Sequence, residues 1–223
     1  MKKLGTLMAA MVMGGTLQAD PTVCQDVADN CAIPGFDAAD MDSIHFDTAG
    51  SGVTTIVGSP TNPVTEPLYD VIFESSELLS HGSGFAIITA DDGWINELSF
   101  YIDDLILPDN SLGMEVAEFS LNARNNNPDA LVNFAFERSD GTTGNLGDFA
   151  MYEGGENEFT IWTNTELERI TLTSDAGFEV ASFKHLRVDI DTVTPDPVRV
   201  DAPYGAGLLA LGLCGLVMAR RRA

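Results

Sequence analysis

Carboxylates are the most abundant side chains in this sequence that could do chemistry, and several of them stand in pairs. The chain has 34 Asp and Glu against 11 Lys and Arg in 223 residues, a formal net charge of −23. Because Ca²⁺ prefers oxygen ligands, we take as candidate ligands of one structural calcium ion Asp91, Asp92, Asp103, Asp104 and Asp109. None of them lies in a D-x-[DN]-x-[DN]-G loop, so ordinary turns capped by Asp side chains are the alternative.

Most of the known catalytic signatures are absent from the sequence. It contains no H-E-x-x-H, G-x-S-x-G or P-loop motif. Its three histidines lack metal-ligand spacing, and its many carboxylates do not single out a catalytic pair. We therefore predict no enzymatic activity and no cofactor other than calcium. A secreted hydrolase is the least favoured alternative. It would require two converging carboxylates in a cleft, or His81 within hydrogen-bond reach of a serine and an acid.

Aromatic side chains are the second group that could bind a ligand. Trp94 and Trp162, together with Tyr101 and Tyr152, could stack on sugar rings as in a carbohydrate-binding module. The alternative is packing inside a sandwich, where aromatic residues are common. Exposure of either tryptophan would favour sugar binding, and burial of both would oppose it. A purely structural role predicts no enclosed pocket.

Short apolar runs, which alternate with period two from residue 68 onward, must position these residues. They occur in the mature chain at 44–46, 53–57, 68–73, 85–89, 94–103, 114–121, 132–136, 159–161, 170–172 and 186–190. A slip of one residue between Val116 and Phe119 predicts a bulge or a bent strand. Turn signals such as Asp140-Gly141 separate the runs. This pattern predicts an all-β, antiparallel β-sandwich of the jelly-roll kind, with an immunoglobulin-like sandwich as the alternative.

The N-terminal part has the features of an exported protein. Residues 1–19 contain Lys2 and Lys3 followed by an apolar stretch, which predicts a signal peptide cleaved after Ala19. Cys24 and Cys31 follow closely, and in an exported chain such neighbours are expected to form a disulfide. We predict an irregular lead-in with short strands over 20–67 and the sandwich core over 68–193.

The two ends of the chain conceal how acidic its middle is. Residues 20–203 carry all 34 acidic residues and six basic ones, so their formal charge is 6 − 34 = −28. A nucleic-acid partner is excluded on this basis, because phosphate recognition requires clustered Lys and Arg.

The C-terminal residues form three consecutive parts. A linker over 194–203 ends in Val200, Asp201, Ala202 and Pro203, and the uncharged run 204–219 is followed by Arg220, Arg221 and Arg222. We predict that 204–223 is a transmembrane segment with an Arg-rich tail inside the cytoplasm. These parts resemble the PEP-CTERM sorting signal of exported proteins of Gram-negative bacteria, with V-D-A-P in place of V-P-E-P. A plain single-span anchor is the alternative.

The resemblance implies a membrane intermediate, processing by an exosortase-type peptidase and a final place at the cell surface or outside the cell. Members of this family are often associated with exopolysaccharide. We therefore predict a structural or adhesive protein of the cell surface or extracellular matrix. A carbohydrate-binding module of the cell envelope is the alternative.

Overall fold

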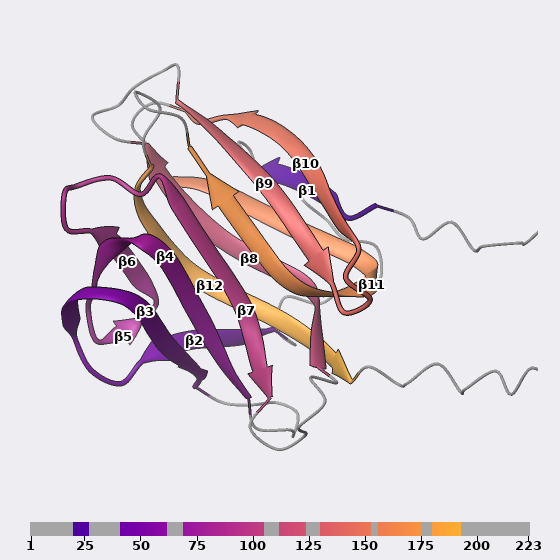
Figure 1. Cartoon of the computed structure of the whole chain (residues 1–223), viewed down its shortest axis with the longest axis horizontal. Coiled ribbons are helices and arrows are strands. Elements are labelled where there is room, and N and C mark those ends of the chain that lie inside the picture. Colours follow the sequence, from indigo (N-terminus) through magenta and orange to yellow (C-terminus); the bar gives the residue numbers. More distant parts are fainter. Residues whose placement is uncertain are drawn as a thin grey trace, which may run out of the picture.

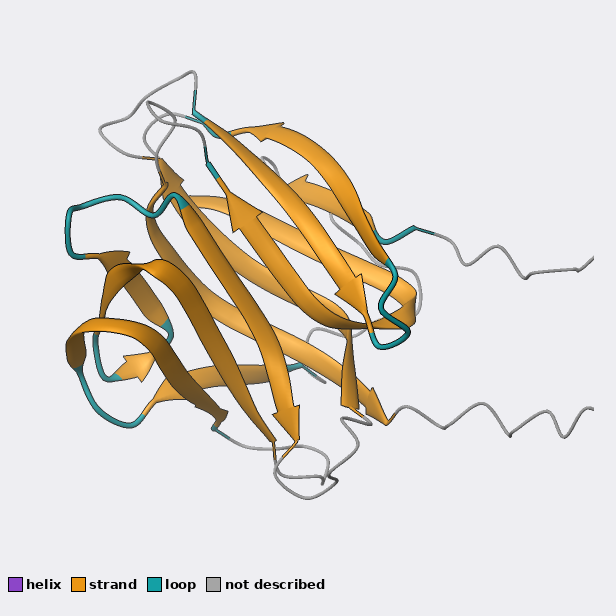
Figure 2. Cartoon of the chain, in the orientation of Figure 1, coloured by secondary structure: helices purple, strands orange, loops and turns teal. Residues whose placement is uncertain are grey.

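The described part of the chain consists almost entirely of β-strands (Figure 2). The computed structural model describes residues 20–26, 41–61, 69–104, 112–123, 130–152, 156–174 and 180–192. The strands are β1 (Thr22–Asp26), β2 (Asp42–Phe46), β3 (Gly50–Pro60), β4 (Tyr69–His81), β5 (Gly84–Phe85), β6 (Ile87–Ala90), β7 (Glu97–Asp104), β8 (Leu112–Ala123), β9 (Leu131–Arg138), β10 (Thr143–Ala150), β11 (Glu156–Thr173) and β12 (Val180–Thr192). In these ranges no helix is long and apolar enough to cross a membrane.

The strands form an antiparallel β-sandwich, which confirms the predicted fold class. In the front sheet, nearest the viewer in Figure 1, the order is β10-β9-β11-β7-β4-β3. In the back sheet the order is β1-β11-β8-β12-β2. Neighbours such as β8 and β11 are distant in the sequence, as jelly-roll connections require.

The long strand β11 belongs to both sheets. Its first part, Glu156–Trp162, pairs with β8, and its last part, Leu167–Thr173, pairs with β9 and β7. The sequence predicted two separate strands here, because the polar run after Trp162 interrupts the alternation. The structure instead carries one continuous strand from the back sheet into the front sheet (Figure 1).

Phenylalanines fill the space between the sheets. Phe119 and Phe183 of the back sheet stack with their ring centroids 5.1 Å apart, and Phe119 also meets Phe134 of the front sheet edge to face at 5.6 Å. All three side chains are buried. Edge-to-face and offset-stacked rings of this kind add to the stability that burial of apolar area provides.

One buried polar contact also joins the two sheets. The Tyr69 hydroxyl on β4 donates a hydrogen bond of 2.7 Å to the carboxylate of Asp42 on β2, and both side chains are buried. Burial raises the pKa of the Tyr69 phenol far above its ordinary value, and the Asp42 carboxylate raises it further. The phenol therefore stays protonated in the folded protein.

β8 has a bulge, but it lies before Val116 and not between Val116 and Phe119 as predicted. Asp189 of β12 lies opposite Val116 and the next residue, Ile190, lies opposite Met114, so Glu115 is an extra residue in β8. The strands β1, β2 and β3 of the predicted lead-in pair with β11, β12 and β4. Lead-in and core thus share one system of sheets.

Candidate functional site

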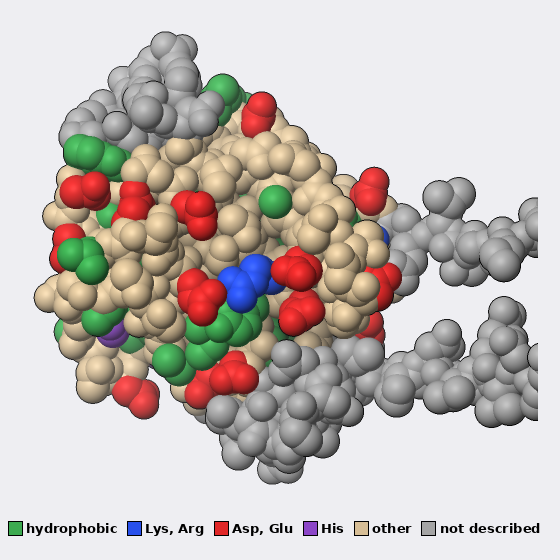
Figure 3. Space-filling model, in the orientation of Figure 1, with side chains coloured by type: hydrophobic (Ala, Val, Ile, Leu, Met, Phe, Trp, Pro, Cys, Tyr) green, Lys and Arg blue, Asp and Glu red, His purple; other side chains and the backbone are tan. Residues whose placement is uncertain are grey.

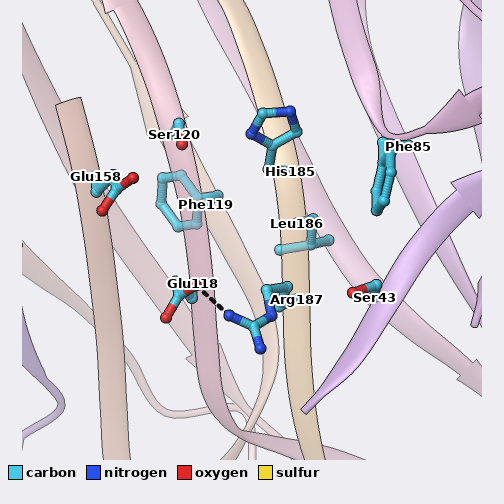
Figure 4. A pocket seen from close by; sticks show the side chains of 9 residues that line it. All are labelled: Ser43, Phe85, Glu118, Phe119, Ser120, Glu158, His185, Leu186 and Arg187. Atoms are coloured by element: carbon cyan, nitrogen blue, oxygen red, sulfur yellow. Dashed lines mark hydrogen bonds and ion pairs between the residues drawn. The ribbon is translucent and has the colours of Figure 1, made fainter. Parts of the chain in front are cut away.

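A hollow of about 400 Å³ opens on the outer face of the back sheet. We call it the pocket, and its lining comes from five strands: β2, β5, β8, β11 and β12. Figure 4 shows Glu158 at one side, Phe85 at the other, and His185 and Arg187 between them. The lining residues are Ser43, Phe85, Glu118, Phe119, Ser120, Glu158, His185, Leu186 and Arg187.

A bulge in β12 shapes the pocket. Lys184 lies opposite Ser120 and the next paired residue, Arg187, lies opposite Glu118, so His185 and Leu186 together face the single residue Phe119 and β12 has one extra residue here. His185 has a φ of 57°, and it is the only non-glycine residue with positive φ in the described ranges. Its amide donates to the carbonyl of Ala86 at 2.8 Å. Leu186 is buried while His185 is exposed, so the bulge turns the imidazole into the pocket.

The rings of Phe85 and His185 form the aromatic wall of the pocket, and His45, which is not a lining residue, packs against Phe85. The Phe85 ring centroid lies 4.2 Å from that of His45 and 6.1 Å from that of His185. Phe85 is nevertheless 56% exposed, which is unusual for a phenylalanine on a sheet. The imidazoles therefore hold an apolar ring in position at the solvent boundary.

Charged and hydroxyl groups form the opposite wall. Register places Glu158 and Ser120 opposite each other on β11 and β8, with Glu118 two residues along β8. Arg187 donates to Glu118 at 3.0 Å, and both side chains are about one third exposed. The pocket thus presents a carboxylate, a guanidinium and a hydroxyl on rigid strands, facing the aromatic wall.

Comparisons with known proteins add little to this geometry. No family model matches the sequence, and no curated protein matches it. Two mutants of a family 29 carbohydrate binding module, CBM29-2, are among the similar solved structures. The first is 13% identical with a TM-score of 0.35 and the second 14% identical with a TM-score of 0.35.

The alignments cover 66% of this chain and 92% of the first mutant, and 68% of this chain and 99% of the second. A third structure, a carbohydrate binding module of family 29, is 9% identical over 82% of this chain and 99% of its own, with a TM-score of 0.23. Because these TM-scores are low, the ligand is inferred from this chain's own residues alone.

A second hollow, of about 440 Å³, lies on the front sheet over β9, β10 and β11. Its basic residue, Arg169, donates to Glu74 at 2.9 Å and lies 4.0 Å above the Tyr101 ring. The Tyr101 hydroxyl also donates to Glu74, at 3.0 Å. The Arg169 hydrogen bond lowers the pKa of Glu74, while burial and Glu74 raise the pKa of Tyr101. The side chains of Arg169, Glu74 and Tyr101 thus serve as polar partners for one another.

Acidic side chains dominate the surface around this network. Figure 3 shows basic atoms near the middle of the front face, with acidic side chains on either side. The strongly negative composition is therefore visible on the folded surface, and the basic groups on this face are placed against acids.

The two tryptophans lie outside the pocket lining, and both are half-buried. Trp162 lies on β11 opposite Val116, four residues beyond Glu158, and Trp94 precedes the bridge between Ile95 and Val180. Tyr101 belongs to the front-sheet network, and Tyr152 is exposed outside both hollows. Sugar stacking by Trp94 and Trp162 stays a prediction, and the pocket offers Phe85 in their place.

The calcium candidates do not come together where the structure describes them. Asp103 lies opposite Asp70 on β4, whereas the amide of Asp91 bonds to Leu78, eight residues further along that strand. At roughly 3.3 Å per residue, one ion cannot bind both. Within the described ranges no three or more His, Cys, Asp or Glu side chains are placed to hold a metal. Asp92 is exposed in the turn after Asp91. Asp109 and the side chain of Asp104 lie outside the part of the chain that the structure describes.

The remaining predicted residues have separate outcomes. Cys24 is disulfide-bonded on β1, but Cys31 lies outside the described residues, so their pairing stays a prediction. His81 packs edge to face against Phe46 at 4.9 Å, and its Nδ1 lies 3.3 Å from the carbonyl of Gly82. The signal peptide, Val200, Asp201, Ala202, Pro203, Arg220, Arg221 and Arg222 also lie outside the described residues.

Proposed function

We propose that this protein is a carbohydrate-binding β-sandwich that holds a sugar chain in the pocket of the back sheet. The observation that carries the proposal is the facing pair of walls, with the exposed ring of Phe85 on one side and Glu158 and Ser120 on the other. A sugar ring has an apolar C–H face and hydroxyls around its edge. The aromatic wall suits that face, and the polar wall suits the hydroxyls.

The backbone of His185 also supports a ligand site. A non-glycine residue with positive φ costs of order 1–2 kcal/mol, and such residues persist where the surrounding structure requires them. Bulges that redirect a side chain are frequent beside binding sites. A purely structural sandwich needs neither the bulge nor the pocket, so sugar binding is the better account of this face.

Glycoside hydrolysis is the second candidate, because Glu118 and Glu158 both line the pocket. Their register makes them diagonal neighbours on one face of the sheet, a separation of roughly 7–8 Å between backbones. One carboxyl of a hydrolytic pair must hold a proton, which burial in an apolar site promotes. Glu158 is exposed and Glu118 faces Arg187. We therefore favour binding without catalysis.

Titration of the purified full-length protein with soluble neutral oligosaccharides tests this function. We expect binding that Phe85→Ala weakens by about tenfold, because loss of a stacking ring removes roughly 1–1.5 kcal/mol. Tyr152→Ala, which removes an exposed aromatic ring outside the pocket, is the matched control and should bind normally. Equal loss in both variants, or no binding by the wild type, would overturn the proposal. Release of reducing ends would establish the hydrolase instead.

The proposed ligand also fits the export and sorting roles that we predict for the two ends of the chain. We propose that residues 1–19 direct export and that the PEP-CTERM-like tail holds the protein in the membrane until an exosortase-type peptidase releases it to the surface. There the pocket would bind matrix polysaccharide. Intact-mass measurement of surface material should find a chain without Arg220, Arg221 and Arg222. Recovery of the complete C-terminus would contradict sorting and leave a plain anchor.

A further inference from the structure

Not all charged side chains in and beside the pocket have a partner of opposite charge among the described residues. Arg187 pairs with Glu118 and Lys184 pairs with Glu156, each at 3.0 Å. These are the basic residues in and beside the pocket, and both are engaged by a carboxylate. A third glutamate, Glu158, has no ion-pair or hydrogen-bond partner for its side chain among the described residues.

The register explains why Glu158 stays uncompensated. Its partner on β8 is Ser120, and its partner position on β1 is occupied by Asp26. No neighbouring strand therefore places a cation opposite it. The −28 charge of residues 20–203 adds a long-range field of the same sign, which repels anions and attracts cations.

We propose that the pocket selects sugars that carry an amino group, with the ammonium of the ligand bound by Glu158. This inference rests on the proposed sugar-binding function. An ammonium at Glu158 would complete the alternation of charge along the polar wall, next to the Arg187–Glu118 pair. Phe85 would contact the C–H face of the same or the adjacent ring. A polyanionic saccharide would meet an unpaired carboxylate and find both nearby cations already engaged.

Oligomers of matched length test the selectivity: glucosamine for a cationic chain, N-acetylglucosamine for a neutral one and galacturonic acid for an anionic one. Affinities of the full-length protein are measured by calorimetry at a pH at which the amino groups are protonated. We expect the glucosamine oligomer to bind about five- to tenfold more tightly than the neutral one, as a charge-assisted hydrogen bond provides. The anionic oligomer should bind least.

Two variants separate a specific contact from general attraction to an acidic protein. Glu158→Gln should remove the preference for the amino sugar, so that this variant binds the glucosamine and N-acetylglucosamine oligomers with equal affinity. Glu97→Gln removes the same charge from an exposed position on β7 of the front sheet and should retain the preference. Equal loss in both variants would mean that only the overall charge acts, and would overturn the inference.

The remaining outcomes distinguish this inference from the function on which it rests. If the neutral oligomer binds in a Phe85-dependent way but the amino sugar gains nothing, selectivity by Glu158 is wrong and sugar binding stands. If the anionic oligomer binds best, the inference is also overturned. If no oligosaccharide binds, both proposals fall.

Discussion

The outer faces of the two sheets differ although they enclose the same core and share the strand β11. On the front face, Arg169, Glu74 and Tyr101 form a closed set in which each polar group has a partner. On the back face, Glu158 and Phe85 line the pocket, and among the described residues they do not belong to a closed set of this kind. Both faces carry the polar residues that alternation supplies, so polarity alone does not make a binding site.

The difference originates in the backbone. On the front face, β11 keeps its register with β7 from Arg169 to Thr173, and its pairing with β9 shifts only before Arg169. On the back face, the bulge of β12 displaces His185 from the alternation and opens the sheet beside Phe85. The pocket thus depends on one bulge among the several that these sheets contain.

The largest effect is expected from the core that supports both faces. Phe183 contacts Phe119, Phe73 and Phe100 and is completely buried. Phe183→Ala should lower the free energy of unfolding by about 3–5 kcal/mol, because it removes apolar contacts and leaves a cavity. Urea denaturation measures this, with Tyr152→Ala as the exposed control. A loss below 1 kcal/mol would mean that the faces do not rely on a common core.

The next largest effect concerns the buried contact between the sheets. Tyr69→Phe leaves the Asp42 carboxylate without its phenol donor and should cost about 1–3 kcal/mol. Below the ordinary tyrosine pKa of about 10 the phenol is neutral in both states, so its contribution is complete. Above that pH the unfolded chain releases the proton while the folded protein keeps it. Stability should therefore fall by about 1.4 kcal/mol per pH unit.

Denaturation curves at increasing alkaline pH measure this slope. The Tyr69→Phe variant should show a shallower decline than the wild type, whereas Tyr152→Phe, at an exposed tyrosine, should decline like the wild type. Identical slopes in all three proteins would show that the phenol of Tyr69 does not resist ionisation.

The sequence located elements of both sheets. Alternation located β4, β7 and β9 of the front sheet, and apolar runs located β2, β8 and β12 of the back sheet, although the extra residue in β8 is Glu115 and lies before the predicted position. β10 was not predicted, since Gly144 and Gly147 weaken the β-strand pattern of its sequence. β1 was not predicted because Cys24 suggested only a stapled turn.

The pocket could not be located from the sequence for a physical reason. Its lining residues are separated by up to 144 positions, from Ser43 to Arg187, and only the pairing of five strands brings them together. The deciding feature is the bulge at His185, and local sequence gives a weak signal for it. The sequence contains Phe85 after Gly84, and it contains Glu158 and Ser120, but nothing in it distinguishes these three residues from other strand residues.

The bulge itself offers a test with opposite effects on stability and binding. His185→Gly removes the strain of positive φ and should raise stability by about 0.5–1 kcal/mol. It also removes the imidazole that supports Phe85, so sugar affinity should fall. His185→Asn is the control that tolerates this φ while lacking the ring. Thermal denaturation and calorimetry measure the two effects, and an unchanged affinity in both variants would show that the imidazole of His185 does not contribute to sugar binding.

The smallest effect is expected on the front face, where Glu74 joins Arg169 and Tyr101. Because Arg169 lowers the pKa of Glu74, its contribution is present at neutral pH and is lost as the pH falls through the folded-state value. The side chain of Glu74 is 42% exposed, so screening limits the loss in Glu74→Gln to below about 1 kcal/mol.

Urea denaturation at neutral and acidic pH should show this loss only at neutral pH, and Glu97→Gln should show none. Sugar affinity should stay within about twofold of the wild type, less than the tenfold that 1.4 kcal/mol represents. The reason is geometric: Glu74 lies on β4, and its contacts run to β7 and the distal part of β11 rather than to β8 or β12. A large loss of sugar affinity in Glu74→Gln would show that the two faces communicate through β11, and that the closed network of the front sheet helps to set the shape of the pocket behind it.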